Sequence, residues 1–114
     1  MDPHEGSIRK GDEMITSSSP TEFAALTATH PDHTIFFAAS WCQPCQTTKP
    51  RVAELAAERE VIVIYADVET HSDLATSFGV QTIPALFTVR DGEVIASARG
   101  VLSVDELRDV LTAE

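Results

Sequence analysis

The sequence predicts an α/β fold in which a central mixed sheet is covered by helices on both faces. Strand-like and helix-like patterns alternate along the chain in the order β-α-β-α-β-α-β-β-α. Two of the strand-like runs, residues 34–39 and 61–66, are almost continuously apolar, as expected of strands that are buried on both faces. Helices must therefore pack above and below these strands.

Length and composition indicate one globular domain. The chain has 114 residues, 43% of them hydrophobic and 23% charged. Its formal net charge of −10 argues against nucleic acid or an anionic membrane as a partner. There is no apolar run of the roughly 18 residues that a membrane span needs, and residues 1–6 lack the pattern of a signal peptide. We therefore expect a cytoplasmic protein whose two cysteines serve chemistry rather than scaffolding.

The chain begins with an arm and a short strand. Residues 1–12 mix charge, Gly and Pro without periodicity and are predicted to form a flexible N-terminal arm. Residues 13–114 are then the folded domain, which opens with an edge strand at 13–16.

The first helix has both of its ends marked in the sequence. Ser19 as N-cap, Pro20 at the first helical position and Glu22 three residues after the cap predict a capping box. The His30-Pro31 step ends the helix. Its buried stripe is predicted to consist of Phe23, Leu26 and Ala24.

A long helix connects the two central strands, residues 34–39 and 61–66. It is expected to run to about Arg59 and to be kinked by Pro50. Its buried positions recur at helical spacing and are Val52, Leu55 and Ala56.

The C-terminal part contains a short helix and a hairpin. Thr70 and Asp73 predict a capped helix that stops at Gly79. Asp91-Gly92 is a strong hairpin pattern. It joins two predicted strands, residues 85–89 and 94–98.

The last helix is amphipathic. Ser103 and Glu106 predict its capping box. Its apolar face is predicted to consist of Val104, Leu107, Val110 and Leu111.

The two cysteines lie between the first central strand and the long helix. A thiolate on Cys42 is stabilised there by the unpaired N–H groups and the positive end of the helix dipole, which lowers the pKa of the thiol. Cys45 lies one turn further along the same face, within bridging distance. The spacing predicts a dithiol that opens and closes, although a Cys-x-x-Cys pair alone also fits half of a zinc site.

The segment Trp41-Cys42-Gln43-Pro44-Cys45 resembles the Trp-Cys-Gly-Pro-Cys motif of the thioredoxin family, with Gln43 in place of glycine. The order of elements also matches the thioredoxin fold, so the resemblance covers roughly residues 14–113. The strand arrangement is implied by this resemblance.

Further residues match the family pattern position by position. Pro50 matches the helix-kinking proline, Gly92 the hairpin glycine and Gly100 the glycine that lines the substrate groove. Ile83-Pro84 matches the family pair joined by a cis peptide bond, which is uncommon in general. The resemblance implies that Pro84 packs against the dithiol and that the backbone of Ile83 pairs with an extended substrate. A strand entry with a trans proline is the alternative.

The resemblance implies the reduction of protein disulfides. Cys42 would attack a substrate disulfide and Cys45 would resolve the mixed disulfide. Trp41 would shield the dithiol and contact the substrate. The implied partners are disulfide-containing proteins and a thioredoxin reductase, in electron transport for cell redox homeostasis. We expect a monomer without a cofactor or a metal.

Three further positions besides Gln43 depart from the family pattern. The family usually carries a buried aspartate and a lysine that assist proton transfer at the resolving cysteine, and the matching residues here are Phe36 and Tyr65. Ala38 replaces a family aromatic residue. Phe36 cannot act as a base and a tyrosine hydroxyl is a poor one at neutral pH, so we expect slow or solvent-assisted resolution at Cys45. Phe36 could alternatively only fill core volume.

The departures leave other functions open. Gln43, Phe36 and Ala38 also fit a divergent oxidoreductase with one dedicated partner, or a binding platform in which the dithiol is secondary.

The four histidines allow a metal site to be considered. His30 and His33 could join the cysteines in a two-His, two-Cys zinc site, but they are expected at the opposite edge of the sheet from Cys42. His4 and His71 are expected to be solvated surface residues.

Overall fold

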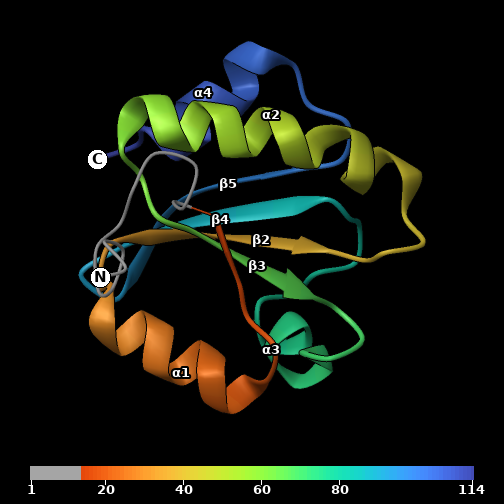
Figure 1. Cartoon of the computed structure of the whole chain (residues 1–114), viewed down its shortest axis with the longest axis vertical. Coiled ribbons are helices and arrows are strands. Elements are labelled where there is room, and N and C mark those ends of the chain that lie inside the picture. The colour runs from red at the N-terminus through yellow and green to blue at the C-terminus, as the bar shows by residue number, and fades with distance from the viewer. Residues whose placement is uncertain (1–13) are drawn as a thin grey trace, which may run out of the picture.

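The computed structural model describes residues 14–114, so the predicted arm, residues 1–12, which includes His4, lies outside the described part together with Glu13. The observed elements follow the predicted order (Figure 1). The strands are β1 (Met14–Thr16), β2 (His33–Ala38), β3 (Val63–Asp67), β4 (Ala85–Arg90) and β5 (Glu93–Arg99). The helices are α1 (Pro20–Thr29), α2 (Gln43–Arg59), α3 (Ser72–Ser77) and α4 (Val104–Leu111). Within 14–114, no helix is long and apolar enough to cross a membrane.

The five strands form one mixed sheet in the order β1-β3-β2-β4-β5. β1 and β2 run parallel to β3, whereas β4 runs antiparallel to both β2 and β5. β2 is therefore the central strand, and its residue Phe36 pairs with Tyr65 on one side and with Leu86 on the other. The chain leaves the central strand β2 at Ala38 and enters α2 at Gln43, so the start of α2 lies at the end of the central strand.

Helices cover both faces of the sheet, as predicted: α2 and α4 lie on one face, and α1 and α3 on the other (Figure 1). Alternate residues of β2 point to opposite faces because side chains alternate along a strand. Phe36 belongs to the core under α2 and α4, together with Val52 and Leu107. Phe37 belongs to the core on the other face, together with Phe87. The central strand is therefore buried along its whole length.

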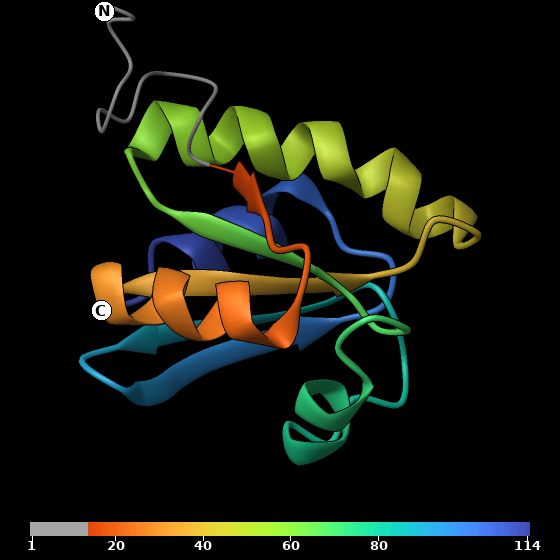
Figure 2. The same ribbon diagram turned by 60° about the horizontal axis from the view of Figure 1, so that its bottom comes forward.

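α2 follows the prediction closely. It contains Pro50, and its ribbon bends between the yellow N-terminal part and the green remainder (Figure 2). The helix ends at Glu60, which adopts the left-handed conformation. The predicted buried positions Val52, Leu55 and Ala56 are all buried.

The hairpin and the last helix also match the sequence-based expectations. Asp91 and Gly92 both have positive φ, 53° and 85°, as a two-residue hairpin turn requires. In α4, the Ser103 hydroxyl accepts the Glu106 N–H, and the Glu106 carboxylate accepts the Ser103 N–H. Of the predicted apolar face, Val104 is exposed and the other three residues are buried.

The prediction for α1 was only partly right. Ser19 accepts the Glu22 N–H as expected, but the Glu22 carboxylate accepts the backbone N–H of Ser18 instead of that of Ser19. The cap is therefore half of a capping box. Ala24 is exposed, and Phe23 is only half-buried, because α1 crosses the sheet near its β1 and β3 edge without sinking any residue fully.

Two predictions for the α3 region were wrong. The helix starts at Ser72 with His71 as its N-cap, so Thr70 does not cap it. His71 is not a surface residue: it is 1% exposed, and its Nε2 lies 2.9 Å from the Ser17 hydroxyl. Its Nδ1 lies 3.1 Å from the Asp67 carbonyl. These polar partners allow the imidazole to be buried between the β1–α1 junction and α3.

Candidate active site

Cys42 and Cys45 form a disulfide bond at the N-terminus of α2, with their Cα atoms 5.2 Å apart. Cys42 is the N-cap residue, and its Sγ accepts the backbone N–H of Cys45 at 3.2 Å. Cys42 is 6% exposed and Cys45 is 0% exposed. The sulfur that a partner can reach is therefore that of Cys42.

The local sequence explains why the pair lies there. The Ala39 carbonyl, just after β2, accepts the Cys42 N–H at 3.1 Å and closes a turn. The Gln46 N–H then donates to the Cys42 carbonyl and begins the helix. Pro44 in the first turn has no N–H to leave unpaired. The remaining N–H groups and the helix dipole favour negative charge on Cys42 once the disulfide is reduced.

The Ile83-Pro84 peptide bond is cis, which confirms the prediction for this pair. The Ile83 carbonyl oxygen lies 4.0 Å from the Cys42 Sγ. The Pro84 carbonyl accepts the N–H of Gly100, whose φ of +85° is one that residues with a side chain rarely adopt. The structure therefore brings the dithiol, the cis-proline segment and the end of β5 together.

An exposed aromatic side chain stands beside the dithiol. Trp41 is 66% exposed, and its indole Nε1 donates to the Glu69 carboxylate at 3.0 Å. Gln43 and Pro44 are exposed as well. Val101, next to Gly100, is 82% exposed. Apolar and polar groups thus meet solvent around Cys42.

Among residues 14–114, the buried residues of the core beside Cys45 include no carboxylate and no histidine. Phe36, 0% exposed, packs its ring edge-on against Tyr65 with the centroids 5.3 Å apart. The Tyr65 hydroxyl accepts a hydrogen bond from the Gln46 side chain at 3.2 Å. Neither Phe36 nor Tyr65 is placed to act as a strong base for the Cys45 thiol.

The two upstream histidines do not join the cysteines. His33 starts β2 and Cys42 follows its end, so the six residues of the strand separate them by about 20 Å. His33 is buried, and its Nδ1 lies 2.7 Å from the His30 carbonyl. Burial lowers the pKa of His33 below its usual value. This placement rules out the zinc site that combined these histidines with the cysteines.

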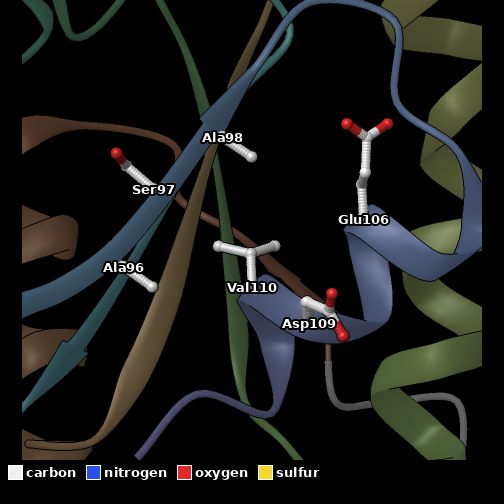
Figure 3. Close-up of a pocket in the computed structure, with 6 residues that line it drawn as sticks. All are labelled: Ala96, Ser97, Ala98, Glu106, Asp109 and Val110. Atoms are coloured by element: carbon white, nitrogen blue, oxygen red, sulfur yellow. The ribbon is translucent and has the colours of Figure 1, made fainter.

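A shallow hollow lies between α4 and β5. Ala96 and Ala98 point from β5 toward Val110, while the carboxylates of Glu106 and Asp109 stand on the α4 side (Figure 3). It includes no residue of the dithiol or of the cis-proline segment. The hollow is therefore separate from the cysteine site, which presents an open surface to a partner.

Two residues at the site were missed in the sequence. Gln46 contacts both Ala39 and Tyr65, and Glu69 holds the Trp41 indole. Long polar side chains on a helix or after a strand are usually solvated, so neither had a distinguishing pattern. The one available indication was position: Gln46 lies in the first turn of the helix that carries the cysteines, and Glu69 lies just after β3.

Comparison with known proteins agrees with this site. The family model for thioredoxin matches residues 14–113. The chain is 30% identical to mouse mitochondrial thioredoxin over 77 residues, which cover 66% of this chain and 46% of that protein. It is 35% identical to a thioredoxin of Listeria monocytogenes over 77 residues, or 66% of this chain and 75% of that one. The matched segment thus spans less than half the length of the mouse protein.

Solved structures show the same relationship. A mutant thioredoxin from Halobacterium salinarum NRC-1 superposes with a TM-score of 0.79 at 30% identity, over 90% of each chain. With a family model that matches nearly every described residue, the chain belongs to the thioredoxin family.

Proposed function

We propose that this protein is a thiol–disulfide oxidoreductase that reduces protein disulfides with Cys42 and Cys45. The observation that supports this function most is the bridged cysteine pair at the start of α2, whose Cys42 is the less buried partner. Membership of the thioredoxin family supports the same activity.

The reaction proceeds in two exchange steps. The Cys42 thiolate attacks one sulfur of a substrate disulfide, an S–S bond forms between them, and the other substrate sulfur leaves as a thiolate that takes up a proton. The Cys45 thiol then loses its proton and attacks the Cys42 Sγ. This forms the Cys42–Cys45 bond and releases the second substrate sulfur, which is also protonated. Two electrons pass from the enzyme to the substrate.

The surrounding residues bind the substrate rather than react. Trp41, Gln43 and Pro44 form the exposed surface around Cys42. The backbone of Ile83, next to the Cys42 sulfur, pairs with an extended segment of the substrate. The Gly100 N–H donates to the Pro84 carbonyl and so holds the Ile83-Pro84 segment of the protein in place.

The proposed partners follow from the chemistry. Substrates are proteins with an accessible disulfide, and a thioredoxin reductase returns the enzyme to its dithiol form. We propose a cytoplasmic monomer that carries electrons in cell redox homeostasis, and that needs neither a metal nor a cofactor of its own.

Reduction of insulin by dithiothreitol tests the proposal. The wild type should accelerate precipitation of the insulin chains, whereas Cys42→Ser should act no faster than dithiothreitol alone because the nucleophile is lost. Ser77→Ala, an exposed change on α3, serves as a folding-neutral control. If Cys42→Ser matched the wild type, the redox function would be wrong and a binding-platform role would be favoured instead.

A further inference from the structure

The side chain of Gln46 links three segments around the dithiol. Its Nε2 donates to the Ala39 carbonyl at 2.9 Å and to the Tyr65 hydroxyl at 3.2 Å. An amide NH₂ carries two protons, so each bond uses one of them. The Ala39 carbonyl can only accept, which fixes the orientation of the amide. Gln46 therefore joins the first turn of α2 to the end of β2 and to β3.

The Ala39 carbonyl also closes the turn that carries Cys42. It accepts the Cys42 N–H at 3.1 Å in addition to the Gln46 side chain, so both of its lone pairs are used. This turn sets the position of the Cys42 backbone. The position of the backbone in turn decides whether the Cys42 sulfur can accept a hydrogen bond from the Cys45 N–H. This hydrogen bond is present, at 3.2 Å.

The other anchor of Gln46 is itself held firmly. Tyr65 is 7% exposed, and Phe36 packs edge-on against its ring. The Lys49 ammonium also lies over this ring, 4.1 Å from its centroid, in a cation–π contact. Lys49 and Gln46 are three residues apart on α2 and so share one helix face. The hydroxyl of Tyr65 is therefore a fixed point from which Gln46 can hold the turn.

We propose that Gln46, anchored by Tyr65, is a positioning residue that holds the turn of residues 39–42 so that the reactive sulfur of Cys42 receives the Cys45 N–H. Gln46 touches no reacting atom and acts through the Ala39 carbonyl. This role rests on the proposed function, because it concerns the reactivity of the Cys42 thiolate. It also assigns Tyr65 a structural purpose at the site that does not require it to act as a base.

Replacement of Gln46 by methionine tests this role. Met keeps the length of the side chain but has no donor. In the Cys45→Ser background Cys42 is the only thiol in the chain, and its thiolate is followed by absorbance at 240 nm. We expect the midpoint of the Cys42 titration to rise by about 0.7 pH unit, and the rate with 5,5′-dithiobis(2-nitrobenzoate) at pH 7 to fall about fivefold. This is the size expected when the Cys42 thiolate loses one hydrogen bond, that from the backbone N–H of position 45.

Tyr65→Phe provides an independent variant, since it removes one acceptor of Gln46 and leaves the Ala39 bond. It should shift the midpoint in the same direction by a smaller amount. The double variant should be no worse than Gln46→Met alone, because both changes break one network. Thr47→Val, an exposed change one position along the helix, should leave the midpoint unchanged.

A purely structural role would lower the melting temperature without moving the thiolate midpoint. If both Gln46→Met and Tyr65→Phe fold and keep the wild-type midpoint and rate, the positioning role is wrong. If only the Tyr65→Phe variant folds, an unchanged Cys42 midpoint in that variant also contradicts the positioning role. These outcomes are independent of the insulin assay, where loss of activity in Cys42→Ser decides the proposed function.

Discussion

At the scale of single residues, Cys42 and Cys45 differ in what surrounds them. Cys42 receives a backbone N–H and lies at the edge of solvent, which favours a thiolate that can meet a substrate. Cys45 is fully buried in an apolar core that includes Phe36. A thiol in such a core is harder to deprotonate, since burial disfavours the charged form. The second exchange step should therefore be the slow one.

Phe36→Asp tests this assignment. A carboxylate in this core can accept the Cys45 proton, so breakdown of a preformed mixed disulfide should become about tenfold faster or more. The measurement is single-turnover release of a labelled thiol from the Cys42 adduct at pH 7.

Phe36→Asn is the matched control, because it has nearly the same volume and polarity without a base. Both variants lose a buried aromatic ring and should lose about 3–5 kcal/mol of stability, so rates are compared only under conditions where each is folded. Equal release rates for Asp and Asn would mean that proton removal from Cys45 does not limit the reaction.

At the scale of secondary-structure elements, the two capped helices α1 and α4 differ in their importance for folding. α4 has a complete capping box and buries Leu107, Val110 and Leu111 in the core. α1 has half of a box and no fully buried residue. The cap of α4 should therefore be coupled to global unfolding more strongly than the cap of α1.

Ser103→Ala and Ser19→Ala form a matched pair for this comparison. Ser103→Ala should cost about 1 kcal/mol in the free energy of unfolding, because the Glu106 N–H loses its acceptor. Ser19→Ala should cost less than half of that, since α1 can fray without opening the core. Urea denaturation followed by circular dichroism measures both values, and an equal or larger cost for Ser19→Ala would contradict this account.

The order and type of every described element could be predicted because each depends on local patterns. The apolar runs of β2 and β3, the Asp91-Gly92 turn and the Ser103 cap act within a few residues. The burial of His71 could not be predicted, since it depends on Ser17, which lies 54 residues earlier in the chain. Gln46 was missed for the same reason: its partners Ala39 and Tyr65 come from two other segments.

At the scale of the whole molecule, the fold assembles the site from segments that are distant in sequence. The start of α2, the Ile83-Pro84 segment and Gly100 meet at one end of the sheet, and Glu69 reaches Trp41 from the end of β3. The family resemblance predicted that Pro84 lies against the dithiol and that Gly100 lines the groove, whereas composition and periodicity could not. The contact between Glu69 and Trp41 was not predicted. The net charge of −10 of the whole chain should disfavour acidic partners at low ionic strength.

Covalent trapping with the Cys45→Ser variant is the most direct test of the central claim that Cys42 attacks and Cys45 resolves. The reduced variant is mixed at pH 7 with a disulfide-bonded protein, quenched with acid and mapped by mass spectrometry. The account predicts that a stable mixed disulfide through Cys42 accumulates, while the wild type passes through it and Cys42→Ser forms none. Absence of the adduct with Cys45→Ser, or an adduct through Cys45 in the Cys42→Ser variant, would contradict it.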